Sequence, residues 1–444
     1  MSPKLVFGVV FALAVFLSTA HAEDWPMWRG PRGDGTSSEA GVPTRWDGES
    51  GKNVRWKTPL PGSGYASPIV LGDRIFTVVC DQEKLDRQLL RLDAKTGEIE
   101  WSKKVVNAPL EKKHLLNSYA SSTPASNGEL VFVVFLEADF GAEKLTGGWK
   151  EATPGNMVVA AYDFDGNQHW LVRPGRFSSV HGFCSSPVLF KDLLIVNGDH
   201  DGDSYIVALK QSTGETVWKV PRQNKTRSYC VPIIREIDGR TQMILSGDKT
   251  VTSYDPHNGK LHWIIQGPTE QFVASLVYNG ELLFLTAGFP ERHMMAIRPD
   301  GRGDVTATHI LWRTTKGCSY VPSPIAAGRY FLVVSDTGIG SCFEAKTGER
   351  VWTRRMGRHY STSMVSAAGL VYFLSDDGEV TVVRPGDEYD EVAQNLLGEK
   401  CFASPAIRWF CTNEMPWLAT SARNGQSIPG GALSMSCAMT PTSR

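Results

Sequence analysis

Short apolar runs separated by turn residues recur along the chain at intervals of roughly 40–50 residues. A unit begins with an apolar segment around a Ser-Pro pair, makes a tight turn and continues into a second apolar run, as in YASPIVLGDRIFTVV (65–79). A polar loop and two further apolar segments follow, joined by a turn such as Asp-x-x-Thr-Gly. Short apolar runs bounded by turn residues predict β-strands, so each unit is expected to hold four antiparallel strands.

Most units end in tryptophan, as in LDAKTGEIEW (92–101) and FEAKTGERVW (343–352), and the repeated positions are Trp56, Trp101, Trp170, Trp218, Trp263, Trp312 and Trp352. Eight first-strand starts are present, opened by the aromatic residues Tyr65, Tyr119, Phe183, Tyr229, Phe272, Tyr320, Tyr360 and Phe402. A four-stranded sheet that is apolar on both faces cannot bury itself alone, whereas radial stacking buries both faces. We therefore predict an all-β fold, an eight-bladed β-propeller over residues 52–407, with a tryptophan wedged between adjacent blades.

Closure of this ring is predicted to be composite. The segment KNVRWKTPL (52–60) matches only a fourth strand, and CFASPAI (401–407) matches only a first strand. After Ile407 the repeat stops, so the closing blade is expected to be incomplete and residues 408–444 to form a divergent, poorly ordered tail. A frameshift in the gene and a genuinely divergent tail are the two explanations left open.

Residues 1–22 read as a secretory signal peptide. Lys4 precedes a 13-residue apolar run (5–17), and Ala20-His21-Ala22 gives a small-x-small cleavage pattern with no lipoprotein cysteine after it. We expect an exported protein, periplasmic or secreted, in which residues 23–51 form an N-terminal wrap. With 46 Lys and Arg against 47 Asp and Glu, the charge balance gives no general attraction to nucleic acid, and no second apolar run is long enough to span a membrane.

The Ser-Pro pair of the first strands and the Ala-Lys-Thr-Gly-Glu-x-x-Trp turn resemble the repeat of the pyrroloquinoline-quinone-like β-propellers. The resemblance covers roughly residues 45–407 and extends to the outer-membrane assembly propeller subunit and, more distantly, to quinoprotein alcohol dehydrogenases. The opening DWPMWRGPRGDGTS (24–37) is similar to exported propeller proteins of planctomycete-type bacteria. The dehydrogenases imply a quinone held between a tryptophan floor and a vicinal disulfide, with calcium and an aspartate base. Because the chain has no adjacent cysteines, we expect no cofactor.

Propeller loops that join the fourth strand to the next first strand, and the second strand to the third, share one face around the channel. These loops supply the candidate ligand-binding residues His114, Asn117, His181, Asp199, His200, Asp201, Arg227, Glu270, His293, Lys316, Arg358 and His359. With Lys113, the cations Arg227, Lys316 and Arg358 suggest an anion site, and the histidines suggest a ligand or metal site. In NGDHDGDS (197–204) three alternate aspartates suggest calcium, but Lys210 stands where a twelve-residue calcium loop needs glutamate, so a turn is the default and no metal is predicted.

The aromatic residues that open the first strands have two interpretations. They pack between blades, or they form a stacking collar for a ligand at the channel mouth. The insertion at 139–156 is either a lid over this face or a loop without a function. We expect a non-catalytic, monomeric binding or scaffold protein whose partner is an envelope protein, a peptide or an extracellular polymer. The alternative is a quinone-dependent dehydrogenase using pyrroloquinoline quinone and calcium.

Overall fold

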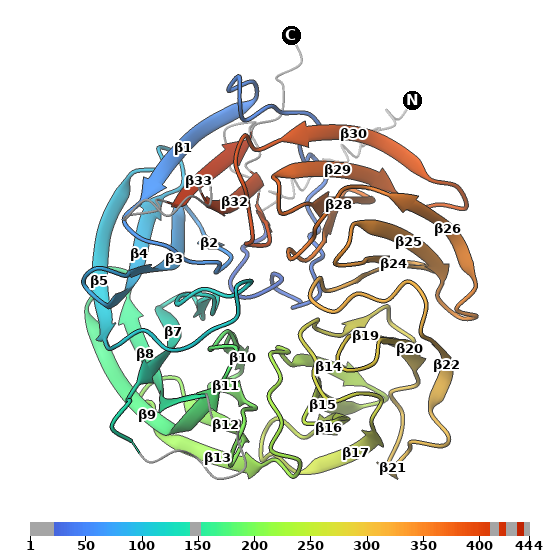
Figure 1. The fold of residues 1–444 in the computed structure, drawn as a ribbon, viewed down its shortest axis with the longest axis horizontal. Helices are drawn as coiled ribbons and strands as arrows, with labels where there is room; N and C mark the ends of the chain where they lie inside the picture. Colours follow the sequence, from blue (N-terminus) through green and yellow to red (C-terminus); the bar gives the residue numbers. More distant parts are fainter. Residues whose placement is uncertain (1–21, 143–151, 409–416, 423–432, 439–444) are drawn as a thin grey trace, which may run out of the picture.

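The computed structural model describes residues 22–142, 152–408, 417–422 and 433–438. Its strands form eight sheets around a central axis (Figure 1), which confirms the predicted β-propeller. In these described ranges no helix is long and apolar enough to cross a membrane. The expected signal peptide falls on residues outside the described ranges, except for Ala22.

The blades are numbered here in chain order. Blade 1 contains β2 (Ile69–Leu71), β3 (Arg74–Asp81), β4 (Asp86–Asp93) and β5 (Ile99–Asn107). Blade 2 contains β6 (Ala125–Ser126), β7 (Leu130–Ala138), β8 (Thr153–Asp163) and β9 (Gln168–Ser179). Blade 3 contains β10 (Val188–Phe190), β11 (Leu193–Gly198), β12 (Tyr205–Lys210) and β13 (Thr216–Pro221). Blade 4 contains β14 (Ile233–Ile237), β15 (Arg240–Gly247), β16 (Thr250–Tyr254) and β17 (Leu261–Gln266).

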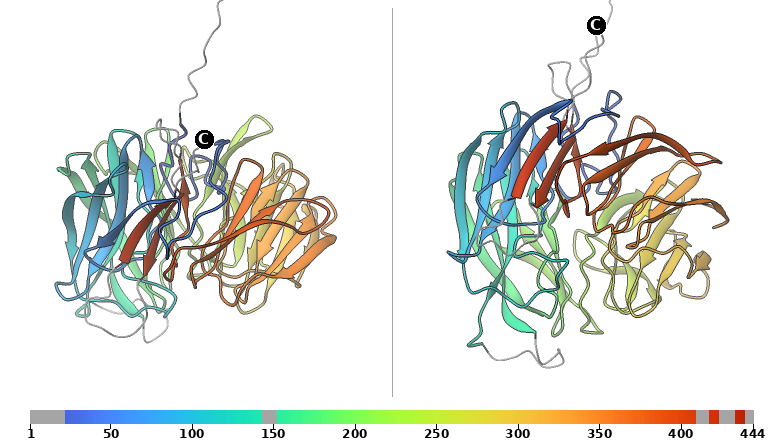
Figure 2. Two further views of the ribbon diagram at one scale, coloured as in Figure 1. Left: turned by 90° about the horizontal axis from the view of Figure 1, so that it is seen from above. Right: turned by 45° about the horizontal axis from the view of Figure 1, so that its top comes forward.

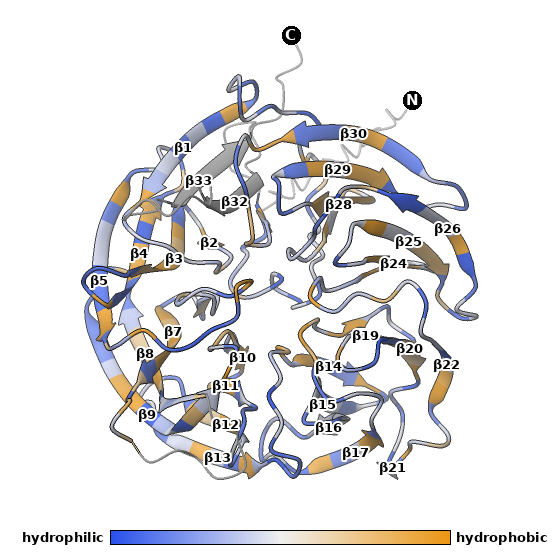
Figure 3. Cartoon of the chain, in the orientation of Figure 1, coloured by the Kyte–Doolittle hydropathy of each residue, from blue (hydrophilic) through white to orange (hydrophobic). Residues whose placement is uncertain are grey.

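The second half of the ring follows the same order. Blade 5 contains β18 (Val277–Tyr278), β19 (Leu283–Ala287), β20 (His293–Ile297) and β22 (Ile310–Thr314), while β21 (Gly303–Asp304) pairs in parallel with β17 of blade 4. Blade 6 contains β23 (Ile325–Ala327), β24 (Tyr330–Val334), β25 (Ile339–Glu344) and β26 (Arg350–Arg355). Blade 7 contains β27 (Val365–Ala367), β28 (Leu370–Leu374), β29 (Glu379–Arg384) and β30 (Asp390–Leu396). Polar and apolar segments alternate along the outer strands in Figure 3, because one side of each outer strand faces solvent.

The seven repeated tryptophans lock each blade to the next. Each indole N–H donates to a backbone carbonyl in the third-to-fourth-strand turn of the following blade, at 2.8–3.2 Å, and the pairs are Trp56–Ala94, Trp101–Phe164, Trp170–Gln211, Trp218–Pro256, Trp263–Pro299, Trp312–Ala345 and Trp352–Gly386. The turn glycine lies against the ring: a Cβ on Gly97 or Gly348 would come within 2.5 Å of an indole atom. The tryptophan of one blade and the Thr-Gly turn of the next blade therefore contact each other.

The closing blade is composite, as predicted. It contains β31 (Ala406–Ile407), β32 (Trp417–Ala422), β33 (Leu433–Ala438) and the N-terminal strand β1 (Val54–Leu60). Figure 2 shows β1 beside β33 and β32. The second and third strands were expected to be missing. The structure shows both strands. The sequence pattern did not reveal them because WLATSA and LSMSCA mix small polar residues with apolar ones. Strand pairing itself uses backbone N–H and C=O groups and needs no continuous apolar run. The rest of the expected divergent tail after Arg408 lies outside the described residues.

The N-terminal wrap crosses the seam of the ring. Trp25 is buried and exchanges two 2.9 Å backbone hydrogen bonds with Val70 of blade 1. Arg29 is also buried, and its guanidinium donates to the carbonyls of Asp34, Ser323, Pro324 and Met364, the last three in blades 6 and 7. Burial lowers the pKa of Arg29 to about 10, so the side chain stays charged at neutral pH.

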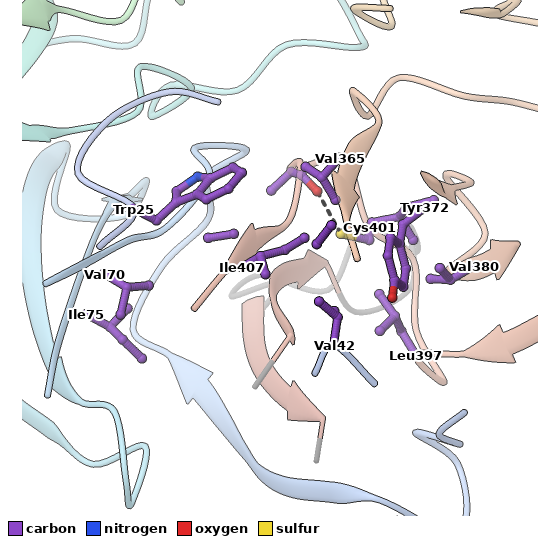
Figure 4. Close-up of a cluster of buried hydrophobic side chains, with 14 of the residues drawn as sticks. Trp25, Val42, Val70, Ile75, Val365, Tyr372, Val380, Leu397, Cys401 and Ile407 are labelled. Carbon is purple, nitrogen blue, oxygen red and sulfur yellow. Dashed lines mark hydrogen bonds between the residues drawn. The ribbon is translucent and has the colours of Figure 1, made fainter. Parts of the chain in front are cut away.

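The wrap also supplies apolar side chains to the core at this seam. Figure 4 shows Trp25 and Val42 of the wrap in one buried cluster with Val70 of blade 1, Tyr372 of blade 7 and Ile407 of the closing blade. The cluster joins the two ends of the ring by apolar burial, the main favourable term in folding. The wrap is therefore a second closure of the ring beside the composite blade.

Candidate functional site: the central cavity

A cavity of about 430 Å³ lies on the axis and opens between the loops that were predicted to share one face. Figure 1 shows these loops converging on the axis. The inner wall uses one repeat position, and its residues are Tyr65, Ser121, Cys184, Tyr229, Val273, Val321, Ser361 and Phe402. Each stands two residues before the Ser, Thr or Val of the Ser-Pro position, so side-chain alternation along an extended segment points both positions toward the axis.

This register divides the eight aromatic residues that open the first strands. Tyr65, Tyr229, Tyr320 and Phe402 line the cavity. Phe183, Phe272 and Tyr360 are instead buried between blades, and Tyr119 lies under the ammonium group of Lys113 at 5.1 Å. The aromatic stands two residues before the Ser-Pro position in blades 1 and 4 and in the closing blade, but three or four before it elsewhere. Tyr320, three residues before Ser323, is the one aromatic outside this register that still lines the cavity. Both interpretations of these residues therefore apply, each to part of the set.

The aromatic side chains of the wall are held in fixed positions. The Tyr65 and Phe402 rings stack with their centroids 4.7 Å apart, across the junction between blade 1 and the closing blade. The Tyr229 hydroxyl lies 2.9 Å from the Ser179 hydroxyl, and the Tyr320 hydroxyl donates to Gln271 Oε1 at 3.1 Å. Rings positioned in this way present flat apolar surfaces with little conformational entropy left to lose on binding.

The mouth of the cavity carries three of the twelve candidate residues. His114 and His181 meet with ring centroids 5.4 Å apart, and the Asn117 side chain donates to the His181 carbonyl at 2.7 Å. Burial lowers the pKa of His181 to about 4, with the positive charge of Arg227 and the neighbouring His114 adding to the shift. His181 is therefore neutral at neutral pH and offers a polar but uncharged edge to the cavity.

Two charged residues outside the twelve candidates also line the mouth. Arg292 lies in the loop before β20, and Asp336 follows β24. Their side chains approach to 3.9 Å, and the carboxylate of Asp336 also accepts the backbone N–H groups of Tyr320 and Val321 at 3.0 and 2.9 Å. One cation and one anion at close range leave the mouth without net charge.

The structure places the other nine candidates outside the wall of this cavity. Asp199 pairs with Arg222 at 2.8 Å, and Asp201 pairs with Arg227 at 2.6 Å, both below the surface. His200 is buried beside the Phe177 ring, with centroids 5.2 Å apart. The remaining candidates are His293, which contacts Glu291 and Arg313, Glu270, which pairs with Lys249, and the exposed Lys316, Arg358 and His359.

These residues do not assemble the anion site or the calcium site that the sequence suggested, and for the acidic loop a turn was the default expectation. The Arg227 charge is directed at Asp201, and Asp203 of the same acidic loop pairs with Lys225 at 2.6 Å. The aspartates of residues 199–203 therefore each face a separate cation instead of a common point. Over the described ranges, no group of three His, Cys, Asp or Glu side chains is arranged to hold a metal ion.

The far end of the cavity is narrower and is closed by the wrap. Below the wall residues a chamber of about 100 Å³ is bordered by Trp28 and by the next inward-facing repeat position, occupied by Ser186, Val231, Ser275, Ser323, Ser363 and Ser404. The indole N–H of Trp28 donates to Ser275 Oγ at 3.3 Å. The sequence did not predict this floor, because the contact joins residues 247 positions apart.

A ring of four-stranded antiparallel sheets, each locked to the next by an indole hydrogen bond, is a β-propeller of the pyrroloquinoline-quinone-like class. The family model described as outer membrane protein assembly factor BamB matches residues 36–147, 147–354 and 301–388, and the chain belongs to this family. No curated protein matches the chain.

Solved structures share the fold at low sequence identity. BamB from Moraxella catarrhalis aligns with a TM-score of 0.53 and 13% identity, covering 86% of this chain and 98% of that one. The quinohemoprotein alcohol dehydrogenase from Comamonas testosteroni aligns with a TM-score of 0.50 and 12% identity, covering 95% and 81%. A europium-containing methanol dehydrogenase aligns with a TM-score of 0.50 and 13% identity, covering 94% and 98%. Proteins described as an assembly factor and as dehydrogenases share this architecture, so the fold alone does not determine the function of this chain.

Proposed function

We propose that this protein is an exported, non-catalytic propeller of the cell envelope that holds a ligand, or an apolar group of a protein partner, in its central cavity. The observation that carries the proposal is the cavity itself: about 430 Å³, walled by fixed aromatic rings and open at the loop face. A concave apolar pocket with a few polar groups at its mouth is the usual form of a small-molecule site.

The loops around the mouth support the same interpretation. Leu115 is 88% exposed at the tip of the loop between β5 and β6, and its neighbour Leu116 lines the cavity. Phe140 and Phe289, in second-to-third-strand loops of the same face, are 63% and 50% exposed. Exposed apolar side chains on the loop face support a surface there that another molecule covers.

Two features favour binding over quinone-dependent oxidation. The wall contains one cysteine, Cys184, and the sequence has no adjacent cysteine pair to stack on a quinone. The carboxylate of Asp336, which lines the cavity, accepts backbone N–H groups and lies 3.9 Å from Arg292. The carboxylate of Asp376 accepts the backbone N–H and the hydroxyl of the lining residue Ser361. The lining residues therefore do not fit the quinone and calcium that the dehydrogenases of this class imply.

A cavity-filling variant tests the proposal. Val273 lines the cavity, so Val273→Trp should block it, while Val217→Trp places the same side chain on the exposed outer strand β13. The uncharged fluorophore N-phenyl-1-naphthylamine should bind wild type and Val217→Trp equally and Val273→Trp at least 10-fold more weakly. Equal binding by all three proteins would refute the cavity as the site.

The dehydrogenase alternative has its own assay. Wild type mixed with pyrroloquinoline quinone and calcium should give no alcohol-dependent reduction of an artificial electron acceptor. A rate that appears with wild type and disappears with Val273→Trp would replace the binding proposal with the enzymatic one.

A further inference from the structure

The chamber below the wall is bordered by five serine hydroxyls, those of Ser186, Ser275, Ser323, Ser363 and Ser404, which we call the serine chamber. All five residues are at most 5% exposed. They occupy one repeat position, so the chamber is built by the propeller itself rather than by a single loop. Its other borders are Val231, the wall residues and the indole of Trp28.

Each of these hydroxyls accepts a hydrogen bond from an N–H group. Ser323, Ser363 and Ser404 accept from the backbone N–H of the corresponding residue in the preceding blade, at 3.0, 3.0 and 2.8 Å. Ser186 accepts from the Thr123 backbone at 2.9 Å, and Ser275 accepts from Trp28 Nε1 at 3.3 Å. These bonds fix the positions of the oxygens.

A hydroxyl that accepts an N–H bond still has its own proton to donate. Among the residues that the structure describes, no acceptor is recorded for the protons of these five hydroxyls. The chamber therefore offers several O–H donors around a space of about 100 Å³. That space is large enough for a small polar group.

Charge decides which acceptor fits. Among the described residues, no Lys, Arg, His, Asp or Glu borders the serine chamber, and the Arg292–Asp336 pair lies at the opposite end of the cavity. The nearby guanidinium of Arg29 is directed at backbone carbonyls, including that of Ser323. A buried ionised group without a counter-charge is disfavoured, whereas an uncharged acceptor satisfies the hydroxyl donors at no such cost.

Above the chamber, the wall suits a flat apolar body. The stacked Tyr65 and Phe402 rings and the fixed Tyr229 ring line the space directly over the serines. We propose that the cavity binds an uncharged aromatic ligand whose hydrogen-bond-accepting end, such as a carbonyl oxygen, enters the serine chamber. This inference rests on the proposed function, because it names the ligand class of the same cavity.

Three probes with one aromatic body separate the ligand class from the existence of the site. These are 2-acetonaphthone, with an uncharged carbonyl, 2-ethylnaphthalene, of nearly the same shape without an acceptor, and 2-naphthoate, which is anionic at pH 8. Each competes with N-phenyl-1-naphthylamine on the full-length protein. We expect 2-acetonaphthone to bind about 3- to 10-fold more tightly than 2-ethylnaphthalene. The anionic 2-naphthoate should bind no more tightly than 2-ethylnaphthalene.

Paired variants assign this preference to the hydroxyls. The double variant Ser323→Ala/Ser363→Ala should lower the affinity ratio of 2-acetonaphthone to 2-ethylnaphthalene at least 3-fold. Ser323→Thr/Ser363→Thr should keep the ratio, because a threonine hydroxyl already takes this position at Thr123. Far-ultraviolet circular dichroism serves as the folding control, and both variants should give the wild-type spectrum.

The outcomes are distinguishable. Equal binding of the three probes, or tightest binding of 2-naphthoate, would overturn the ligand class and leave the cavity as a binding site. An unchanged ratio in the alanine variant would overturn the role of the serines. Binding of none of the probes, including the fluorophore, would remove the proposed function and this inference together.

Discussion

Replacing Trp263 by phenylalanine tests the contact that holds neighbouring blades together. Trp263 is fully buried, and its indole N–H donates to Gln242 Oε1 at 2.7 Å and to the Pro299 carbonyl at 3.2 Å. Phenylalanine fills the benzenoid part of the space but has no donor. Both acceptors keep one other partner, since the Gln242 side chain donates to Pro299 and Ser253 donates to Gln242.

The magnitude follows from these contacts. One bifurcated hydrogen bond at a net value of about 0.5–1.5 kcal/mol, plus about 1 kcal/mol for the space that the smaller ring leaves empty, gives a loss of about 1.5–2.5 kcal/mol. Trp101→Phe is the matched control, because Trp101 is only half-buried and makes one such bond, to Phe164. Its expected cost is about 1–2 kcal/mol.

Urea unfolding followed by far-ultraviolet circular dichroism measures both variants against wild type. The midpoint should fall further for Trp263→Phe than for Trp101→Phe, with an unchanged slope for each transition. A loss below about 1 kcal/mol at Trp263, or a larger loss at Trp101, would refute the view that buried indole bonds carry the blade-to-blade contact.

Three further changes test other parts of the structure. Gly348→Ala should destabilise the protein by at least about 1 kcal/mol more than Gly328→Ala in urea, because both glycines have positive φ but only a Cβ on Gly348 would meet the Trp312 ring. Arg29→Ala should lower the free energy of unfolding by about 2–4 kcal/mol in thermal melts, and Arg29→Lys should not restore it, since lysine lacks the planar fork that reaches several carbonyls. Burial lowers the pKa of His200 to about 4, so the unfolded chain binds more protons between pH 4 and 6.5 and stability falls as the pH falls through this window, by up to about 3 kcal/mol. His200→Leu should remove that part of the pH dependence when unfolding is measured at several pH values.

Each of these expectations has a contradicting result. Equal losses of unfolding free energy in the two glycine variants would show that the contact between the turn and the indole does not limit the residue at position 348. Wild-type stability in Arg29→Lys would show that only the positive charge of Arg29 matters to the wrap. An identical pH dependence in His200→Leu and wild type would show that burial does not hold this imidazole neutral.

The repeat allowed the fold to be predicted because its signal is local. The tryptophan and the Thr-Gly turn recur at fixed spacing, and the structure shows that they touch across each blade boundary, as Trp312 does at Gly348. The strands β32 and β33 were missed because their sequences mix polar and apolar residues. They pair through backbone groups, and no continuous apolar run in the sequence indicates a strand there.

The site was harder to predict because it depends on register and on distant pairing. Aligning the repeats on their aromatic residues left Phe272 and Tyr360 with two interpretations, at the channel or between blades, and the structure buries both between blades. Alignment on the Ser-Pro position gives the cavity wall, including Cys184. Asp201 was a rim candidate, but its charge is neutralised by Arg227, 26 residues away. No local pattern indicates such a pair.

The most direct test of the central claim is a crystal structure of the protein bound to 2-acetonaphthone. We expect the naphthalene ring to lie between the Tyr65–Phe402 stack and Tyr229, with the carbonyl oxygen within hydrogen-bond distance of Ser323 or Ser363. A ligand seated elsewhere on the propeller, or one seated in the cavity with its carbonyl directed at the mouth, would contradict it.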